Sequence, residues 1–333
     1  MNTYGRIFRV HVFGESHGER VGVLLDGVPA GIPLSVDDFR ADLQRRKPGA
    51  SGTTPRKESD EPVLRSGIFQ GRTTGAPLLI EFLNENIRSK DYAHLQEHPR
   101  PGHADFTTRH KYGGFADYRG GGHFSGRLTL ALVAAGVVAK KICAPIHIQA
   151  QLIAAGGNPN IEEAVAQAIH DRDSIGGVVA CSAQGLPIGL GEPFFDSLES
   201  MISHAIFAIP AIKGIEFGSG FQAAAMRGSE HNDALIAADG TTASNYAGGI
   251  NGGISNGNEL LFRVAVKPTS SIGKTQESFQ FAQQSVQPLE VAGRHDVCIA
   301  LRVPVVVEAV TAMVLADALL ITQQRSPIHH EKN

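Results

Sequence analysis

Residues 100–129 concentrate the kinds of groups that bind anions. Arginine, lysine and histidine side chains alternate there with a glycine triplet, Gly120–Gly122. Because glycine has no Cβ, the backbone N–H groups of a triplet can approach a ligand closely. The Ala/Val/Leu-rich residues 125–142 predict a helix whose free N–H groups and positive dipole end would lie beside the same anion. Charge in a flexible surface loop would be scattered, so we expect a small-anion site here.

Two histidines stand out by their neighbours. His17 follows Ser16 in a glycine-bounded turn. A hydrolase triad is not indicated, because adjacent side chains diverge and the G-x-S-x-G elbow is absent. Taken alone, His17 fits a structural histidine. His103 lies near Asp105 and could bind a metal together with His110, but the surrounding arginines and lysine disfavour a dication, so we predict no metal site.

Further polar groups occur in the second half of the chain. Lys267–Ser271 follows a predicted strand with an ammonium group and three hydroxyls, a set that suits phosphate binding and a ligand-free Ser/Thr turn equally well. Asp296, taken alone, fits a turn carboxylate that bonds to backbone.

One motif points to a different class of protein. Residues 218–223 match G-x-G-x-x-A after a strand-like stretch, and Asp239 lies about twenty residues beyond, as in a dinucleotide fingerprint. An NAD(P)-dependent reductase with a Rossmann fold is therefore an alternative. It is disfavoured because no βαβ repeat follows and residues 245–257 are too rich in glycine for a crossover helix.

The composition limits the class of protein further. The 333 residues are 42% hydrophobic and 19% charged, as in soluble globular proteins, and the net charge of -3 argues against nucleic-acid binding. The N-terminus has no apolar signal region and no apolar run approaches about eighteen residues, so we expect a cytoplasmic protein with no membrane partner. The three cysteines, Cys143, Cys181 and Cys298, are far apart in apolar surroundings and predict buried free thiols.

The periodicity predicts alternating strands and helices in both halves of the chain. Strands are expected at 6–13, 21–28, 63–71, 76–83, 146–153, 175–183, 214–217, 259–266 and 297–303, and helices at 36–46, 125–142, 161–170, 194–208 and 305–324. A long irregular segment, 84–124, is expected to be functional. No Pro- or Ser-rich linker divides the chain, so we predict a single domain over residues 1–325 and a polar tail over 326–333.

Several motifs together resemble the chorismate synthase family. The segments 100–105, 111–113 and 117–122 closely resemble signatures of that family. Further segments agree in the family's order, namely 13–18, 45–49, 248–257, 267–272 and 293–296. The resemblance covers nearly the whole chain. It implies an α+β fold, a layered β-α-β sandwich of two similar halves with helices between outer antiparallel sheets.

The resemblance also implies an activity. Chorismate synthases convert 5-enolpyruvylshikimate 3-phosphate to chorismate by anti 1,4-elimination of phosphate, the last common step of the shikimate pathway to aromatic amino acids. The family requires reduced FMN although the reaction has no net redox change, and it is usually a homotetramer. The sequence leaves open whether NADPH reduces the FMN on this chain or a separate flavin reductase supplies it. A non-catalytic relative that binds flavin would carry similar motifs.

Residue roles are implied by position in the family motifs. His17 would assist the departing phosphate, His103 would help protonate the reduced flavin, and Asp296 would work with the flavin in removing the C6 proton. The implied substrate-binding residues, whose guanidinium groups suit a phosphate and two carboxylates, are Ser16, Arg45, Arg46, Arg127 and Arg294. The implied cofactor-binding residues are Arg46, His123, Phe124, Ser125, Pro210, Ala211, Gly252, Lys267, Pro268, Thr269, Ser270, Ser271 and Arg294.

The chain departs from the family pattern next to the glycine triplet. Where most relatives read Gly-Gly-Arg-Ser-Ser-Ala-Arg-Glu-Thr, this chain has His123, Phe124 and Leu128 in place of an arginine, a serine and a glutamate. Gly52 also stands where a second arginine is often found. These differences bear on flavin affinity and on reduction of the flavin by a nicotinamide cofactor.

Overall fold

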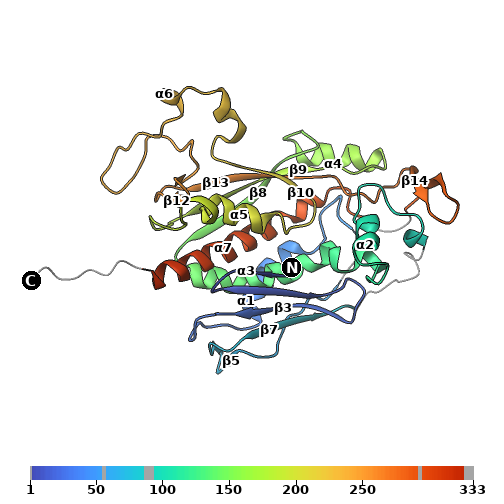
Figure 1. Cartoon of the computed structure of the whole chain (residues 1–333), viewed down its shortest axis with the longest axis horizontal. Helices are drawn as coiled ribbons and strands as arrows, with labels where there is room; N and C mark the ends of the chain where they lie inside the picture. The colour runs from blue at the N-terminus through green and yellow to red at the C-terminus, as the bar shows by residue number, and fades with distance from the viewer. Residues whose placement is uncertain (1, 55–57, 86–93, 292–294, 326–333) are drawn as a thin grey trace, which may run out of the picture.

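Two antiparallel sheets form the outer layers of the molecule, and helices fill the space between them (Figure 1). The computed structural model describes residues 2–54, 58–85, 94–291 and 295–325. One continuous cluster of buried apolar side chains runs from the first sheet through the helices to the second. This layering is the one expected from the family resemblance, and the α+β prediction is confirmed.

The first sheet has five strands in the order β1-β2-β3-β7-β4. Their bounds are β1 Thr3–Tyr4, β2 Arg9–Gly14, β3 Arg20–Asp26, β7 Leu78–Leu83 and β4 Val63–Leu64. In β3, Val21, Val23 and Leu25 are fully buried and Leu24 is exposed. This alternation places one face of the sheet on the helices and the other toward solvent.

The second sheet has four strands in the order β10-β13-β9-β8. Their bounds are β10 Ile212–Phe217, β13 Leu260–Val266, β9 Gly177–Gln184 and β8 His147–Ala155. Three hairpins of two strands each complete the described strands: β5 Ile68–Phe69 with β6 Arg72–Thr73, β11 Ile250–Asn251 with β12 Ile254–Ser255, and β14 Gln276–Gln280 with β15 Ser285–Leu289.

Helices α3 (Thr129–Cys143) and α7 (Pro304–Gln324) form the centre of the middle layer. Both are apolar around most of their circumference, which is the pattern of a helix buried on all sides. They run side by side in the same direction (Figure 1). They approach closely at Gly136, where an added Cβ would lie 2.3 Å from the Cβ of Ala309. Only glycine fits there, because the two backbones nearly touch.

Helix α7 is long and apolar enough to cross a membrane by length and composition alone. However, 78% of its apolar window is buried inside the protein, against α3 and the second sheet. It is therefore the core helix of the sandwich. The remaining helices are α1 Asp37–Arg46, α2 Asp105–Lys111, α4 Ile161–His170, α5 Leu198–Ile206 and α6 Gly228–His231.

Several predicted elements differ from the structure. Residues 297–303 do not form a strand, because Ile299–Arg302 coils into a 3-10 helix that leads into α7. The helix predicted over 125–142 begins at Thr129, after a separate 3-10 turn at Gly126–Leu128. The predicted strand 63–71 is divided between β4 and β5. Residues 105–111 of the segment expected to be irregular form α2.

The dinucleotide motif does not occupy a nucleotide-binding crossover. Gly220–Ala225 is a 3-10 helix that follows β10 and leads into a long excursion carrying α6. β10 itself pairs antiparallel with β13, whereas a Rossmann unit needs parallel strands joined by a helix. The motif is therefore a coincidence of glycine spacing.

The prediction of one domain over 1–325 is supported by the shared core but stays a prediction, and the tail 326–333 lies outside the described residues. The predicted thiols are confirmed, since Cys143, Cys181 and Cys298 are buried and free. Burial raises the pKa of Cys143 and of Cys181 to about 12, which makes both thiols unreactive at neutral pH.

Candidate active site

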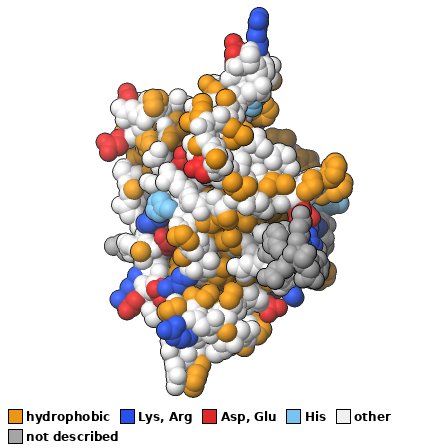
Figure 2. Space-filling view, turned by 90° about the vertical axis from the view of Figure 1, so that its left-hand side faces the viewer, with side chains coloured by type: hydrophobic (Ala, Val, Ile, Leu, Met, Phe, Trp, Pro, Cys, Tyr) orange, Lys and Arg blue, Asp and Glu red, His pale blue; other side chains and the backbone are white. Residues whose placement is uncertain are grey.

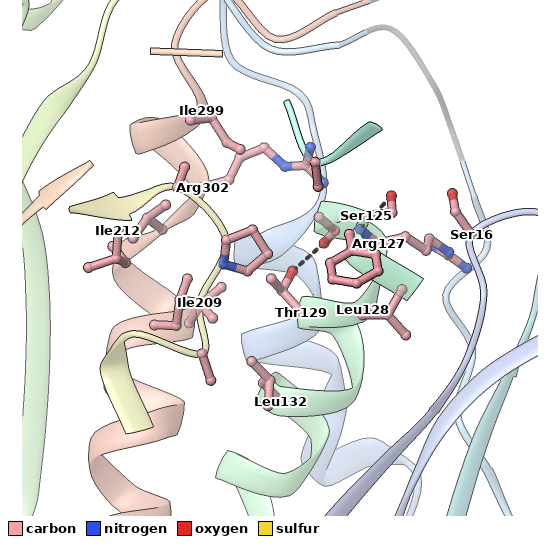
Figure 3. Close-up of a pocket in the computed structure, with 18 of the residues that line it drawn as sticks. Ser16, Ser125, Arg127, Leu128, Thr129, Leu132, Ile209, Ile212, Ile299 and Arg302 are labelled. Atoms are coloured by element: carbon pink, nitrogen blue, oxygen red, sulfur yellow. Dashed lines mark hydrogen bonds between the residues drawn. The ribbon is translucent and has the colours of Figure 1, made fainter. Parts of the chain in front are cut away.

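A cavity of about 870 Å³ opens between the two sheets at the N-terminal ends of α3 and α7. Ile209, Ile212 and Ile299 line one side, and Ser16 and Arg127 face them from the other (Figure 3). A site of this size can hold ligands with several rings or charged groups. Since helix N-termini carry partial positive charge, α3 and α7 both favour an anion at this end.

The glycine triplet of residues 120–122 joins the two predicted catalytic histidines. All three glycines have positive φ, at 59°, 81° and 52°. An added Cβ at Gly120 would lie 2.3 Å from Cε1 of His17, and one at Gly121 would lie 3.4 Å from Cε1 of His103. The triplet is therefore needed for both its backbone conformation and its lack of side chains, and it brings together histidines that are far apart in sequence.

His17 is 4% exposed and lies behind the cavity wall, while its neighbours Ser16 and Gly120 line the cavity. The turn that carries it is held by backbone bonds, because Ser16 N donates to Gly122 O at 3.1 Å. Asn84 secures the same turn by donating from Nδ2 to Glu15 O at 3.1 Å and to Gly18 O at 2.8 Å. His17 is therefore held directly behind the residues that line the cavity, although its own ring is almost completely buried.

His103 lines the cavity and is bound to a charged pair behind it. Its Nδ1 lies 2.6 Å from Asp105 Oδ1, and Arg100 donates to both carboxylate oxygens of Asp105 at 2.8 Å. Burial would raise the pKa of Asp105, but the hydrogen bonds from Arg100 and His103 outweigh it and hold that pKa well below its ordinary value. An ionised carboxylate at Nδ1 places the Nδ1 proton toward Asp105 and leaves Nε2 for the cavity.

The loop predicted to bind phosphate lies beside His103. Lys267 Nζ donates to Gly102 O at 3.2 Å and to Ser270 Oγ at 3.1 Å, and Arg100 donates to Ser271 Oγ at 3.0 Å. Burial, together with the charge of Lys213, lowers the pKa of Lys267. All five residues from Lys267 to Ser271 line the cavity. An ammonium group and hydroxyls are thus arranged along one wall.

Two arginines, Arg46 and Arg127, are buried at the cavity around one carboxylate. Arg46 NH2 lies 2.8 Å from Asp60 Oδ2, and Arg127 NH1 pairs with Asp60 Oδ1. Burial lowers the pKa of Arg46 to about 10, against the opposing effect of Asp60, so this side chain is still charged at neutral pH. Two guanidinium groups and one carboxylate leave the cluster with a net positive charge.

Asp296 faces the same cavity from the loop before α7. Its Oδ1 accepts from Thr54 N at 3.0 Å, and Arg302 NH1 lies 3.2 Å from Oδ2. Arg302 also donates from Nε to Arg46 O at 2.9 Å. The strand expected over 297–303 does not form, and the Asp296 carboxylate just before it pairs with Arg302 in the following 3-10 helix.

Most of the predicted site residues meet at this cavity. Its lining includes His123, Phe124, Ser125, Pro210 and Ala211 in addition to the residues described above. Arg45 and Gly252 do not line it, because Arg45 forms two 2.7 Å bonds with buried Glu308 and Gly252 lies in the β11–β12 hairpin. Arg294 lies outside the described residues.

Four charged side chains that were not predicted as site residues also belong to this cavity. Asp60, Arg100, Lys213 and Arg302 all line the cavity or support a residue that does. Arg100 could have been found, because it begins the motif that contains His103 and Asp105. Asp60 and Arg302 have no local signal, since their partners are distant in sequence.

A sandwich of two antiparallel sheets around helices, with two histidines and buried arginines at one cavity, defines an α+β enzyme that acts on a small anion. The sequence profile of the family described as chorismate synthase matches residues 8–320. This chain therefore belongs to the chorismate synthase family, whose members are lyases that eliminate phosphate.

Individual relatives agree over the full length. Chorismate synthase of Chitinophaga pinensis is 63% identical over 329 residues, covering 98% of this chain and 99% of that protein. Chorismate synthase of Methanocaldococcus jannaschii is 42% identical and covers 96% of each chain. A crystal structure of chorismate synthase superposes with a TM-score of 0.71 at 26% identity, over 96% of this chain and 93% of the other. The reductase alternative finds no support in these similarities.

Proposed function

We propose that this chain converts 5-enolpyruvylshikimate 3-phosphate to chorismate in the cavity between the sheets, with reduced FMN as cofactor. The observation that carries the proposal is that the His17 and His103 rings lie beside two consecutive glycines, Gly120 and Gly121, at a cavity with buried arginines. A proton donor, a proton acceptor and a concentrated positive charge at one cavity suit the loss of phosphate and of a proton from one small substrate.

The reaction breaks two bonds of the substrate and leaves no net change in oxidation state. The carbon–oxygen bond to phosphate breaks with its electron pair, and the proton at C6 departs as a new double bond forms. Reduced FMN would supply transient electron density to this elimination. The protein must therefore stabilise a departing phosphate and move protons at separate points.

The residues divide these tasks by their position. Arg46 and Arg127 would neutralise the phosphate, and His17, next to the cavity-lining residues Ser16 and Gly120, would be its proton donor. Asp296, which pairs with Arg302, would accept the proton from C6. His103 would exchange a proton at Nε2, since its Nδ1–H is donated to Asp105.

The residues that line the cavity fit a flavin. Phe124, Pro210 and Ala211 supply apolar surface for a flat ring, and the Lys267–Ser271 loop supplies an ammonium group and hydroxyls for a phosphate. Arg46 Nε is buried and has no hydrogen-bond partner among the residues that the structure describes. Because such a donor is costly to leave unpaired, it is available to a bound anion.

An anaerobic assay tests the proposal. Purified protein is mixed with 5-enolpyruvylshikimate 3-phosphate and photoreduced FMN, and chorismate is followed by its absorbance. Product without consumption of flavin supports the proposal. Binding of reduced FMN without product would indicate the non-catalytic relative. Turnover of NADPH without chorismate would revive the reductase alternative.

A second arm of the assay addresses the source of electrons. Oxidised FMN and NADPH replace the photoreduced flavin under the same anaerobic conditions. Because an arginine, a serine and a glutamate of the family pattern are replaced near the triplet, we propose that a separate flavin reductase supplies reduced FMN. Chorismate formed from NADPH without an added reductase would contradict this.

We also propose that the protein is a cytoplasmic homotetramer. Figure 2 shows apolar side chains gathered on the end of the molecule that faces left in Figure 1. The excursion after β10 exposes Phe221, Leu235 and Ile236 at 86%, 72% and 66%. Large apolar side chains at such exposure favour burial against another subunit. Light scattering after gel filtration would measure the mass, and a monomer at micromolar concentration would contradict the proposal.

A further inference from the structure

A chain of buried polar contacts connects the turn that carries His17 to the cavity arginines. Asn84, which follows β7 and is 9% exposed, stands in its middle. Its Nδ2 group donates to both Glu15 O and Gly18 O, and its Oδ1 accepts from Arg127 Nε at 2.9 Å. One amide therefore holds the turn through its donor and the arginine through its acceptor.

Asp60 continues the connection from Arg127 to Arg46. Each of its carboxylate oxygens pairs with one guanidinium group, and its side chain is 1% exposed. Its backbone has a φ of 51°, a left-handed conformation that is unusual for a residue other than glycine. Burial would raise the pKa of Asp60, but the charges of Arg46 and Arg127 outweigh it and lower that pKa. The carboxylate thus stays ionised between two cations.

The two arginines differ in how fully their donors are used. Arg127 donates to Asn84, Asp60 and the carbonyl of Leu83. Arg46 donates to Asp60 but reaches Thr129 only at 3.4 Å, and its Nε has no partner in the described part of the chain. Arg127 is therefore a fixed anchor, whereas Arg46 keeps donors for a ligand while Asp60 holds its position.

We propose that Asn84 and Asp60 are positioning residues that hold the His17 turn and Arg46 as one mechanical unit. The histidine that would protonate the departing phosphate and the guanidinium group that would bind it then keep a fixed relative position. Neither positioning residue needs to exchange a proton with the substrate. The physical coupling follows from the contacts alone, while its consequence for turnover rests on the proposed function.

Hydrogen exchange of the ligand-free protein tests the coupling without any activity. Asn84→Asp keeps an acceptor oxygen for Arg127. It replaces the donor to Glu15 O and Gly18 O by a carboxylate oxygen, which repels both carbonyls. Asp60→Asn removes the charge that links the two arginines. We expect each variant to accelerate amide exchange at both residues 14–19 and 58–60, as measured by mass spectrometry. The decisive result is faster exchange at 14–19 in Asp60→Asn, because no contact of Asp60 with that turn is observed.

Two matched controls lie outside the cavity. Asn245→Asp removes a comparable bond from an asparagine Nδ2 to Glu259 O at 2.8 Å. Asp42→Asn removes a carboxylate that pairs with Arg45 and Lys140. Neither should change exchange at 14–19. If Asp60→Asn fails to fold, the reciprocal effect of Asn84→Asp at 58–60 decides the question.

Kinetics then give the functional consequence. Each variant should lower kcat on the order of 10²-fold, because a misplaced group can cost that much without contacting the chemistry. The double variant should lose little more than either single one, since both break the same unit. The proposal would be overturned if each variant changed hydrogen exchange only in its own segment. It would also be overturned if the loss of kcat in the double variant equalled the product of the two single losses. Retained coupling in a wild-type protein that makes no chorismate would overturn only the proposed function.

Discussion

His17 and His103 lie beside neighbouring glycines of one triplet, yet the protein holds them by different means. His17 is almost completely buried and its ring packs on the backbone of Gly120. The side chain of His103 is 23% exposed and is bound through Nδ1 to Asp105, which Arg100 holds in turn. Close packing against Gly120 restrains the first histidine, and an ion pair at Nδ1 restrains the second.

This difference predicts what should disturb each histidine. A group held by packing responds to added volume, whereas a group held by an ion pair responds to removal of charge and to acid. Both are equally necessary if the proposed function is correct. A substitution in the triplet therefore tests the packing of His17, and one at Asp105 tests the charge behind His103. Substitutions at the two histidines and at His123 give the scale for comparison.

The largest expected effect is that of removing either imidazole. His17→Ala and His103→Ala should each lower kcat by about 10²- to 10⁴-fold, as expected for loss of a general acid or base, with substrate binding largely retained. Steady-state turnover with photoreduced FMN measures this, and His170→Ala, at an exposed helix end, serves as the control. Unchanged turnover in either variant would remove that histidine from the mechanism.

Added volume at the triplet should affect His17. Gly120→Ala would place a Cβ 2.3 Å from the His17 ring, so we expect kcat to fall on the order of 10²-fold. Gly113→Ala is a matched control, because Gly113 has a φ of 60° against 59° at Gly120, but the nearest described atom to a Cβ added there is Phe115 Cδ2 at 3.6 Å. Equal losses in both variants would show that backbone strain, and not displacement of His17, is responsible.

Removal of the charge behind His103 should have a smaller effect. In Asp105→Asn the amide no longer fixes the Nδ1–H tautomer, and we expect about a tenfold loss of kcat and about 2 kcal/mol of stability at pH 7. Because the folded pKa of Asp105 is depressed, its stabilisation is present above the ordinary aspartate pKa and is lost as pH falls through the lower folded value. Urea unfolding followed from pH 7 down to about pH 2 should show a constant difference between the wild type and the variant above about pH 4 and a narrowing difference below it. A difference that stays constant over this whole range would contradict this account.

The smallest effect is expected at His123, whose ring nitrogens face Gly14 O at 2.7 Å and Asn2 Oδ1 at 3.1 Å. A histidine titrates near pH 6.5 in model peptides, whereas an arginine stays charged. His123→Arg should therefore flatten the pH dependence of FMN and substrate affinity between about pH 6 and 8.5, by about 1 kcal/mol at the alkaline end. Titrations of both proteins, corrected for the ligand phosphate, measure it. Parallel profiles would place His123 outside the anion site.

The sequence predicted local features well and long-range ones poorly. Helix α4 runs over residues 161–170 as predicted, because its amphipathic pattern and the Asn160 cap are both local. Asp60 lies in a stretch that the composition marks only as polar, and its role depends on Arg127, which is 67 residues away. Arg45 and Arg46 are neighbours on one helix and point in directions about 100° apart. The sequence alone does not determine which of them faces the cavity.

The close approach of α3 and α7 at Gly136 gives the cavity a fixed aperture. Both helices begin at the cavity, and their backbones are in contact about 10 Å along the axis from the start of α3. A larger side chain at this position would push the two helices apart and would separate Thr129 from Val303 at the cavity. The width of the active-site opening is therefore determined partly by Gly136, a residue that does not line the cavity.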